Sequence, residues 1–198
     1  MGRKMSTATV AVVQNWEYQT EKGIIVPYIG GAVSDSFPED FLVRLYFKMK
    51  HDNSLRRTLP DVSIHTLAGF VSYFYGKTML ICFEKAKDPG AINPLAGFVW
   101  VYDIVGPGSL RRASVGVCFF KEYWGNKVIY EMGKLALDWM FKELKLSVIL
   151  GTIAAWNRAS VRFGKILGFE VCGTVPMFFL KADSSADMVM VALRRKNG

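Results

Sequence analysis

Residues 114–127 read SVGVCFFKEYWGNK, and a helical pattern starts where this stretch ends. Its apolar first half predicts a buried strand, and the glycine at position 125 predicts a tight turn. A strand that passes through a short turn into a helix directs several backbone N–H groups, and the positive end of the helix dipole, toward one point. That arrangement suits a phosphate group, although a glycine at such a junction can also serve chain reversal alone.

The segment that follows, residues 127–144, has the clearest helical periodicity in the chain. Its charged residues recur at spacings of three or four, which places them on one solvated face. They are Lys127, Glu131, Lys134, Asp138 and Lys142. The apolar residues between them are expected to pack against a sheet.

Around this junction, strand-like runs and helical segments are mixed, which predicts an α+β fold. The expected strands are 23–31, 78–84, 96–104, 113–120, 147–155, 171–180 and 187–193, and the expected helices are 36–50, 62–76, 127–144 and 158–167. Turns containing Gly and Pro predict an antiparallel meander for the three strands between 78 and 120. Ser36, Asp61 and Asn157 are the expected helix caps.

Composition limits the class of protein. With 198 residues, of which 51% are hydrophobic and 21% charged, the chain fits one domain, expected over residues 23–198, after an N-terminal arm or extra strand over residues 1–22. The longest uncharged run, Val62 to Gly76, is 15 residues and is too short to span a membrane. We therefore expect no membrane partner.

The three cysteines and two histidines indicate a reduced protein without a metal site. Cys82, Cys118 and Cys172 are odd in number, widely spaced and set in apolar runs, which predicts buried thiols and a cytoplasmic location. His51 and His65 offer too few imidazole ligands for a zinc site, so we expect no metal.

Positive charge gathers late in the chain. The formal net charge is +8, and residues 121–198 contain 12 basic and 7 acidic residues. Such a surface attracts nucleic acid, acidic protein or a phosphorylated cofactor, and charge alone does not choose among them.

A second segment, residues 157–169, reads NRASVRFGKILGF. It resembles the N-x-x-S-x-R-x-x-x-x-x-G-F signature of the GNAT superfamily of acyl-CoA N-acyltransferases, and most closely the branch of ribosomal-protein N-terminal acetyltransferases. Residues 122–131, EYWGNKVIYE, resemble the turn and helix start of that branch. The resemblance covers about residues 78–175. It implies a mixed, twisted sheet of about seven strands flanked by about four helices, in which the parallel strands 113–120 and 147–155 splay apart.

The resemblance also implies a function and a set of binding residues. The expected reaction is transfer of acetyl from acetyl-CoA to a primary amine, on a small molecule or a protein, by direct attack in a ternary complex. Backbone groups of Val117, Cys118 and Phe119 would bind the pantetheine arm. The residues expected to surround the pyrophosphate are Trp124, Gly125, Asn126, Lys127, Val128 and Ile129. Asn157 would cap its helix, contact the cofactor, or do both.

Two positions depart from the family pattern. Lys127 stands where a second turn glycine is usual, so its side chain either pairs with phosphate or obstructs the cofactor. Gly164 stands where many members have a tyrosine that protonates the departing thiolate. Ser160 is the nearest hydroxyl that can take that role, or it bonds only to nearby backbone.

Acyl transfer also requires a base that leaves the amine neutral. Asp103 and Glu122 are the carboxylates expected near the site, and a base acting through water is the third possibility. His65 and Cys118 are expected to be packing residues rather than catalysts.

Two alternative functions stay open at this level. The basic C-terminal part is compatible with a GNAT-fold enzyme that modifies nucleic acid. The changes at Lys127 and Gly164 are compatible with a degenerate member that binds or supports other molecules. The apolar segment 175–180, VPMFFL, is also compatible with a homodimer.

Overall fold

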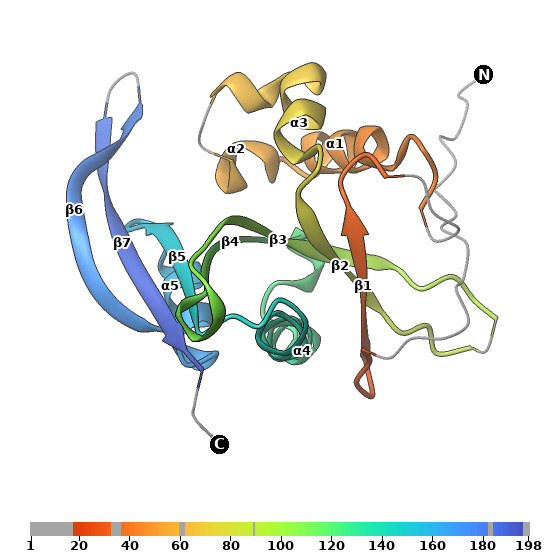
Figure 1. Cartoon of the computed structure of the whole chain (residues 1–198). Helices are drawn as coiled ribbons and strands as arrows, with labels where there is room; N and C mark the ends of the chain where they lie inside the picture. The colour runs from red at the N-terminus through yellow and green to blue at the C-terminus, as the bar shows by residue number, and fades with distance from the viewer. Residues whose placement is uncertain (1–17, 33–36, 60–61, 89, 182–183, 196–198) are drawn as a thin grey trace.

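A computed structural model describes residues 18–32, 37–59, 62–88, 90–181 and 184–195 as an α+β fold (Figure 1). The strands are β1 (Gly23–Ile29), β2 (Thr78–Glu84), β3 (Leu95–Val105), β4 (Arg112–Phe119), β5 (Val148–Ala154), β6 (Glu170–Lys181) and β7 (Ser184–Arg194). The α-helices are α1 (Phe41–His51), α2 (Leu55–Thr58), α3 (Leu67–Phe74), α4 (Lys127–Glu143) and α5 (Arg158–Ile166). Three short 3-10 turns are η1 (Val62–His65), η2 (Gly108–Leu110) and η3 (Lys121–Tyr123).

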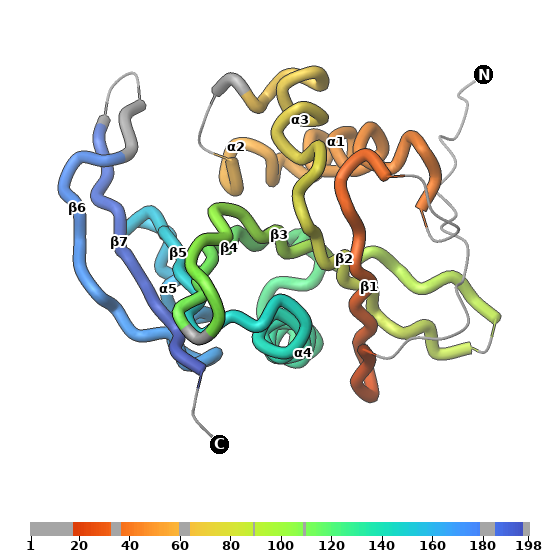
Figure 2. Tube along the Cα trace, viewed as in Figure 1, coloured from red at the N-terminus to blue at the C-terminus, as the bar shows by residue number. Residues whose placement is uncertain are grey.

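All seven strands form one sheet in the order β1-β2-β3-β4-β5-β7-β6. Among the strands in the described part of the chain, only β4 and β5 are parallel neighbours, and every other pair is antiparallel. The predicted meander of β2, β3 and β4 and the predicted mixed sheet are both confirmed. Figure 1 shows α1, α2 and α3 over one face of the sheet and α4 over the other, and the trace in Figure 2 places β1 and β6 at opposite ends.

The parallel pair separates partway along its length. Its register runs from Arg112 with Val148 to Val115 with Gly151. Beyond that point, residues 116–119 pair only with β3, and residues 152–154 pair only with β7. We call these two segments the diverging ends. Their separation confirms the predicted splay.

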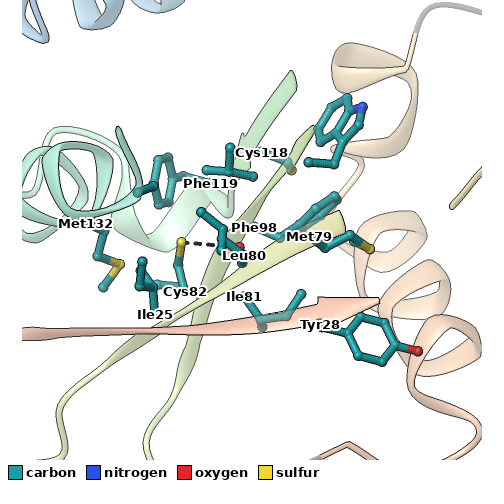
Figure 3. Packing of buried hydrophobic residues seen from close by; sticks show 14 of the residues in the cluster. Ile25, Tyr28, Met79, Leu80, Ile81, Cys82, Phe98, Cys118, Phe119 and Met132 are labelled. Carbon is teal, nitrogen blue, oxygen red and sulfur yellow. Dashed lines mark hydrogen bonds between the residues drawn. The ribbon is translucent and has the colours of Figure 1, made fainter. Parts of the chain in front are cut away.

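The core lies on both faces of β1, β2 and β3, because alternate side chains point to opposite faces. Figure 3 shows Ile25 and Cys82 with Met132 of α4 on one face. On the other face, Tyr28 contacts Phe41 of α1, with ring centroids 5.1 Å apart. These three strands are therefore covered on both faces, as their nearly continuous apolar sequences indicate.

The first helix begins later than expected. The N–H of Phe41 donates to the carbonyl of Pro38 (2.9 Å), so the proline lies in a turn before α1 rather than in its first turn. Asp40 occupies the N-cap position without a side-chain hydrogen bond to the helix. The expected cap, Ser36, lies outside the described residues.

The predicted helix over 62–76 is wrong as a single element, because a 3-10 turn and α3 replace it. Thr66 is extended between them, and its hydroxyl accepts the N–H of Gly69 (3.0 Å), so Thr66 caps α3. Asp61, the expected cap, lies outside the described residues. The four-residue α2 was not predicted, since it is too short to show periodicity. No helix in the described ranges has the length and hydropathy that a membrane crossing requires.

The segment before β1 is described from Tyr18 onward, and the rest of the expected arm, residues 1–17, lies outside the described residues. Gln19 forms a β-bridge with Ile24. The Thr20 hydroxyl accepts the Gly23 N–H (2.9 Å) and donates to Glu131 Oε2 (3.2 Å). This short segment is thus attached to both β1 and α4.

Trp100 and Gly116 provide a test of the packing at the start of the diverging ends. A Cβ at Gly116 would lie 1.9 Å from Cζ2 of Trp100, whose side chain is buried. We expect Gly116→Ala to lower the free energy of unfolding by about 1–3 kcal/mol, because the buried indole would have to shift to make room for the methyl group. Urea denaturation monitored by circular dichroism measures this change.

Gly173→Ala is the matched control, since no atom lies within 4 Å of a Cβ at that strand position. We expect its unfolding free energy to stay within about 0.5 kcal/mol of the parent. Equal effects of the two substitutions would contradict the described contact of Trp100 with Gly116.

Candidate functional site

The backbone groups of β4 alternate between its two neighbouring strands. The N–H of Phe120 donates to the carbonyl of Ala96 (3.0 Å), which places this residue's backbone groups on the β3 side. Cys118, two residues earlier, is paired with Phe98 in the same ladder. Because the alternation has a period of two, Cys118 directs its N–H and C=O to β3. Its backbone is engaged there and does not face β5.

The odd-numbered residues of β4 face β5. The Ser147 N–H donates to the carbonyl of Arg111 (2.7 Å), and Val115 is the last residue of β4 that pairs with β5. Val117 and Phe119 continue this alternation past the end of the pairing. No strand among the described residues pairs with that side of them, so their N–H groups point toward the diverging ends.

The turn after β4 leads directly into α4, as the sequence predicted. Gly125 has φ +78°, a conformation that favours glycine, and no atom lies within 4 Å of a Cβ built there. Asn126 caps the helix, because its side-chain oxygen accepts the Val128 N–H (3.1 Å). Within the described ranges, no oxygen accepts the N–H of Gly125 or of Lys127.

The side chain of Trp124 connects this turn to the end of β4 through a hydrogen bond. Its indole Nε1 donates to the carbonyl of Phe119 (2.8 Å), so Phe119 keeps only its N–H for a ligand. The guanidinium of Arg57, in α2, lies 5.5 Å from the centre of the indole ring. Sequence reasoning missed both contacts, because nothing local to residues 57 or 119 signals a partner so distant in the chain.

The second motif places α5 beside the diverging ends. The Asn157 side-chain oxygen accepts the Ser160 N–H (3.2 Å), so the predicted cap is confirmed, while contact with a cofactor stays a prediction. Ser160 is half-buried in the first turn of α5. One turn later Gly164 is buried, and a Cβ there would lie 3.9 Å from Cδ1 of Ile153, which belongs to the diverging end of β5.

Aromatic packing holds α5 against α4 and β4. The Phe163 ring lies 5.7 Å from that of Phe119 and 5.3 Å from that of Tyr130, between ring centroids. A Cβ at Gly133 of α4 would lie 3.0 Å from Cζ of Phe163, so the small residue permits this close approach. The two motifs are therefore in contact in the fold.

Glu122 is engaged in an ion pair. Lys48 Nζ of α1 lies 3.0 Å from its Oε1. Burial by itself would raise the pKa of this carboxyl, but the hydrogen bonds from its own backbone and from Lys48, with the charge of Lys48, outweigh burial and lower the pKa below its usual value. A carboxyl whose pKa is lowered is a weaker base. The sequence contained no signal for Lys48 as the partner.

Asp103 lies at an irregular point of β3, with φ +51° and an exposed side chain. The preceding residue, Tyr102, pairs with Ser114 of β4. Val117 is three residues beyond Ser114, or about 10 Å further along the strand. Asp103 and the N–H of Val117 are thus separated along the sheet.

Cys118 and His65 have structural surroundings, as expected. Cys118 is buried, and burial raises the pKa of its thiol to about 11, against the smaller opposing effects of hydrogen bonds with Thr58 and Ser54. His65 Nε2 lies 2.6 Å from the carbonyl oxygen of Leu59. The Cys118 thiol therefore stays protonated near neutral pH and is a poor nucleophile.

The groups brought together match what acetyl-CoA requires. The N–H groups of Val117 and Phe119 can donate to a carbonyl or amide of the pantetheine end. The N–H groups of Gly125 and Lys127, at the positive end of α4, suit a pyrophosphate. Lys121 and Lys127 are exposed and add positive charge at this turn. These donors fit the cofactor that the sequence motifs imply.

Comparison with known proteins agrees with this geometry at the level of the fold. A structure of ribosomal-protein-S5-alanine acetyltransferase from Vibrio fischeri has a TM-score of 0.68 at 16% identity, covering 91% of this chain and 97% of that chain. Spermidine N-acetyltransferase from Vibrio cholerae, with CoA and spermine, has a TM-score of 0.66 at 15% identity, covering 86% and 95%. A GNAT-family acetyltransferase from Bacillus anthracis has a TM-score of 0.62 at 17% identity, covering 89% and 97%.

The family itself follows from the sequence comparison. No curated protein sequence matched the chain. The family model for the acetyltransferase (GNAT) domain, however, matches residues 33–170, which include β4, the turn, α4, β5 and α5. The chain belongs to the GNAT acetyltransferase family.

Proposed function

We propose that this protein transfers the acetyl group of acetyl-CoA to a primary amine by direct attack in a ternary complex. The observation that carries the proposal is the end of the β4–β5 pairing at Val115 and Gly151. Past that point, the N–H groups of Val117 and Phe119 have no partner strand among the described residues. The same strand continues through the turn into the first residues of α4. The N–H groups proposed for the pantetheine end and for the pyrophosphate of acetyl-CoA thus lie on one continuous segment, from β4 to the start of α4.

Acetyl-CoA supplies the acetyl group as an activated thioester. In this proposal the N–H groups of Val117 and Phe119 hold the pantetheine end, and one of them polarises the thioester carbonyl. The backbone N–H and C=O of Cys118 are hydrogen-bonded to β3, so in this proposal Cys118 donates no hydrogen bond to the cofactor. Fixed backbone donors need no reorganisation as negative charge develops on the carbonyl oxygen.

In this proposal the pyrophosphate binds at the loop between β4 and α4 and at the first helical turn of α4. The expected residues are Trp124, Gly125, Asn126, Lys127, Val128 and Ile129. Anions are favoured at this end of a helix by its dipole and by N–H groups that no carbonyl accepts. Asn157 caps α5 and, in this proposal, also contacts the cofactor.

Two proton transfers complete the reaction. Ser160 lies in the first turn of α5 and, in the absence of a tyrosine at Gly164, is assigned as the donor to the departing thiolate. Water is assigned as the route by which the amine loses its proton. Glu122 is paired with Lys48, and Asp103 lies more than about 10 Å along the sheet from Val117, so neither carboxyl is favoured as a direct base.

The acceptor is proposed only as an amine. The Vibrio cholerae structure similar to this one holds CoA and spermine, which supports an amine acceptor in this fold. Nucleic acid remains the alternative, since Arg158, Arg162 and Lys165 of α5 are exposed. A homodimer also stays a prediction; residues 175–180 lie in β6, at the edge of the sheet, and Met177 is exposed there.

Isothermal titration and an amine panel test the proposed reaction directly. We expect micromolar binding of acetyl-CoA and release of free CoA thiol, detected with a thiol reagent, when a primary amine such as spermine or an N-terminal alanyl peptide is added. Absence of binding to folded protein at millimolar acetyl-CoA would refute the proposal. Duplex DNA or RNA binding that weakens steeply with salt, without release of CoA thiol in the presence of any amine of the panel, would favour the nucleic-acid alternative.

Ser160→Ala tests the assigned proton donor. We expect kcat to fall at least about tenfold, because general acid catalysis contributes more than that, while the Kd for CoA changes little. Ser72→Ala, at an exposed serine of α3, is the control and should leave kcat unchanged. An unchanged kcat in Ser160→Ala would show that the hydroxyl only bonds to nearby backbone.

Asp103→Asn and Glu122→Gln test the assignment of water as the base. We expect each variant to keep kcat within about threefold of the parent and to keep the same pH dependence, because neither carboxyl accepts the proton directly. Glu122→Gln also removes a group with a lowered pKa, so the small stability it contributes through Lys48 should be present at neutral pH and disappear in acid. Loss of the rise in kcat/KM with increasing pH in either variant would identify that carboxyl as the base.

A further inference from the structure

Tyr102 of β3 is a half-buried tyrosine to which the proposed function gives no role. Trp100, two residues earlier, points to the face that α3 covers, because its indole Nε1 donates to the Tyr73 hydroxyl (3.3 Å). Side chains two residues apart on a strand share a face, so Tyr102 points the same way. Burial raises the pKa of Tyr102, and hydrogen bonding with Thr152 lowers it by a smaller amount. The phenol therefore stays protonated near neutral pH and can both donate and accept hydrogen bonds.

Thr152 brings a second hydroxyl to the same face of the sheet. Ile153, the next residue of β5, points toward α5, since a Cβ at Gly164 would lie 3.9 Å from its Cδ1. Neighbouring residues of a strand point to opposite faces, so Thr152 points away from α5 and to the side of Tyr102. Tyr102 pairs with Ser114 of β4, and β5 lies beyond β4 in the sheet. The side chain of Tyr102 thus reaches over β4 to the diverging end of β5.

The two hydroxyls lie at the level where β4 and β5 separate. Gly151 is the last residue of β5 that pairs with β4, opposite Val115, and Thr152 is the first residue after it. Thr152 is therefore only about one residue, or about 3.3 Å along the strand direction, short of the level of Val117. The length of the Tyr102 side chain covers most of the distance along the sheet between its own backbone and Val117.

From this placement we infer that the hydroxyls of Tyr102 and Thr152 hold the water through which the acceptor amine loses its proton. The inference rests on the proposed function, in which water is that route, and adds the residues that position the water. Two hydroxyls that bond to each other keep further donor and acceptor capacity, which a water molecule can use. Ser160 belongs to α5, so the two proton transfers take place on opposite faces of the sheet.

The proton balance of the reaction defines what this water does. The amine N–C bond forms and the thioester C–S bond breaks, and a protonated primary amine releases two protons to become an amide. One proton passes to the held water and on to bulk solvent, to which Thr152 is exposed. The thiolate sulfur gains the other through Ser160. Because the phenol of Tyr102 stays protonated, Tyr102 positions the water and is not itself the base.

Steady-state kinetics of Tyr102→Phe and Thr152→Val test this inference, with spermine or an N-terminal alanyl peptide as acceptor, whichever the parent acetylates faster. We expect each variant to lose roughly tenfold in kcat, as for one hydrogen bond made in the transition state. The KM for the amine and the Kd for acetyl-CoA should stay within about twofold of the parent. Thr152→Ser, which keeps the hydroxyl, should retain most of the activity. The double variant should lose about as much as either single variant, because each disturbs the same water.

The pH dependence of the loss separates a role in proton transfer from a role in packing. Above the pKa of the acceptor amine, the amine arrives neutral and hydroxide can accept its remaining proton, so the held water matters less. We expect the loss of kcat/KM in Tyr102→Phe to shrink to about twofold there. An equal loss at every pH, or weaker binding of acetyl-CoA, would indicate a packing role and overturn the inference.

Tyr75→Phe is the matched control, because it makes the same chemical change at the end of α3, where Tyr75 is 70% exposed. Its kcat should equal that of the parent. Thr152 is also exposed, so Thr152→Val is expected to fold and to decide the test even if Tyr102→Phe does not fold. A parent that releases no CoA thiol with any amine of the panel would overturn the proposed function together with this inference. An active parent whose Tyr102→Phe and Thr152→Val variants keep full kcat would overturn this inference alone.

Discussion

The structure of the site depends on where one parallel strand pair stops. β4 and β5 share a ladder only as far as Val115 and Gly151, and each strand then stays bonded to its outer neighbour, β3 or β7. Buried backbone groups are nearly always paired, so an interruption inside a sheet is an unusual feature. Here the outer ladders make it stable, and the N–H groups of Val117 and Phe119 become available to a ligand.

The helices around the diverging ends keep them in place. Phe163 of α5 packs on Phe119 at the end of β4, and Gly133 of α4 lets that ring approach closely. The Trp124 indole N–H donates a hydrogen bond to the carbonyl of Phe119, which fixes the loop that leads into α4. Phe119 of β4 thus contacts both Phe163 of α5 and Trp124 of the turn, so the end of β4 is packed against both.

Electrostatics divides the charged residues of the site into two groups. Glu122 and Asp52 are bound to Lys48 and to the backbone of Lys121, and they stabilise the contact between α1 and the turn. Lys127, by contrast, is exposed and only loosely paired. Part of the +8 net charge therefore lies at the turn before α4, where the proposed function places a polyanionic cofactor.

The local sequence determined the elements that carry strong periodicity or strong caps: the meander, α4 from its charged face, and the Asn157 cap of α5. Motifs 122–131 and 157–169 also determined the family, because they keep side-chain types at fixed spacing. Only the tertiary structure decided the partners of Glu122 and of the Phe119 carbonyl, and the split of the expected helix 62–76 at Thr66. Contacts between distant residues, and breaks set by a single extended residue, depend on packing that no local pattern records.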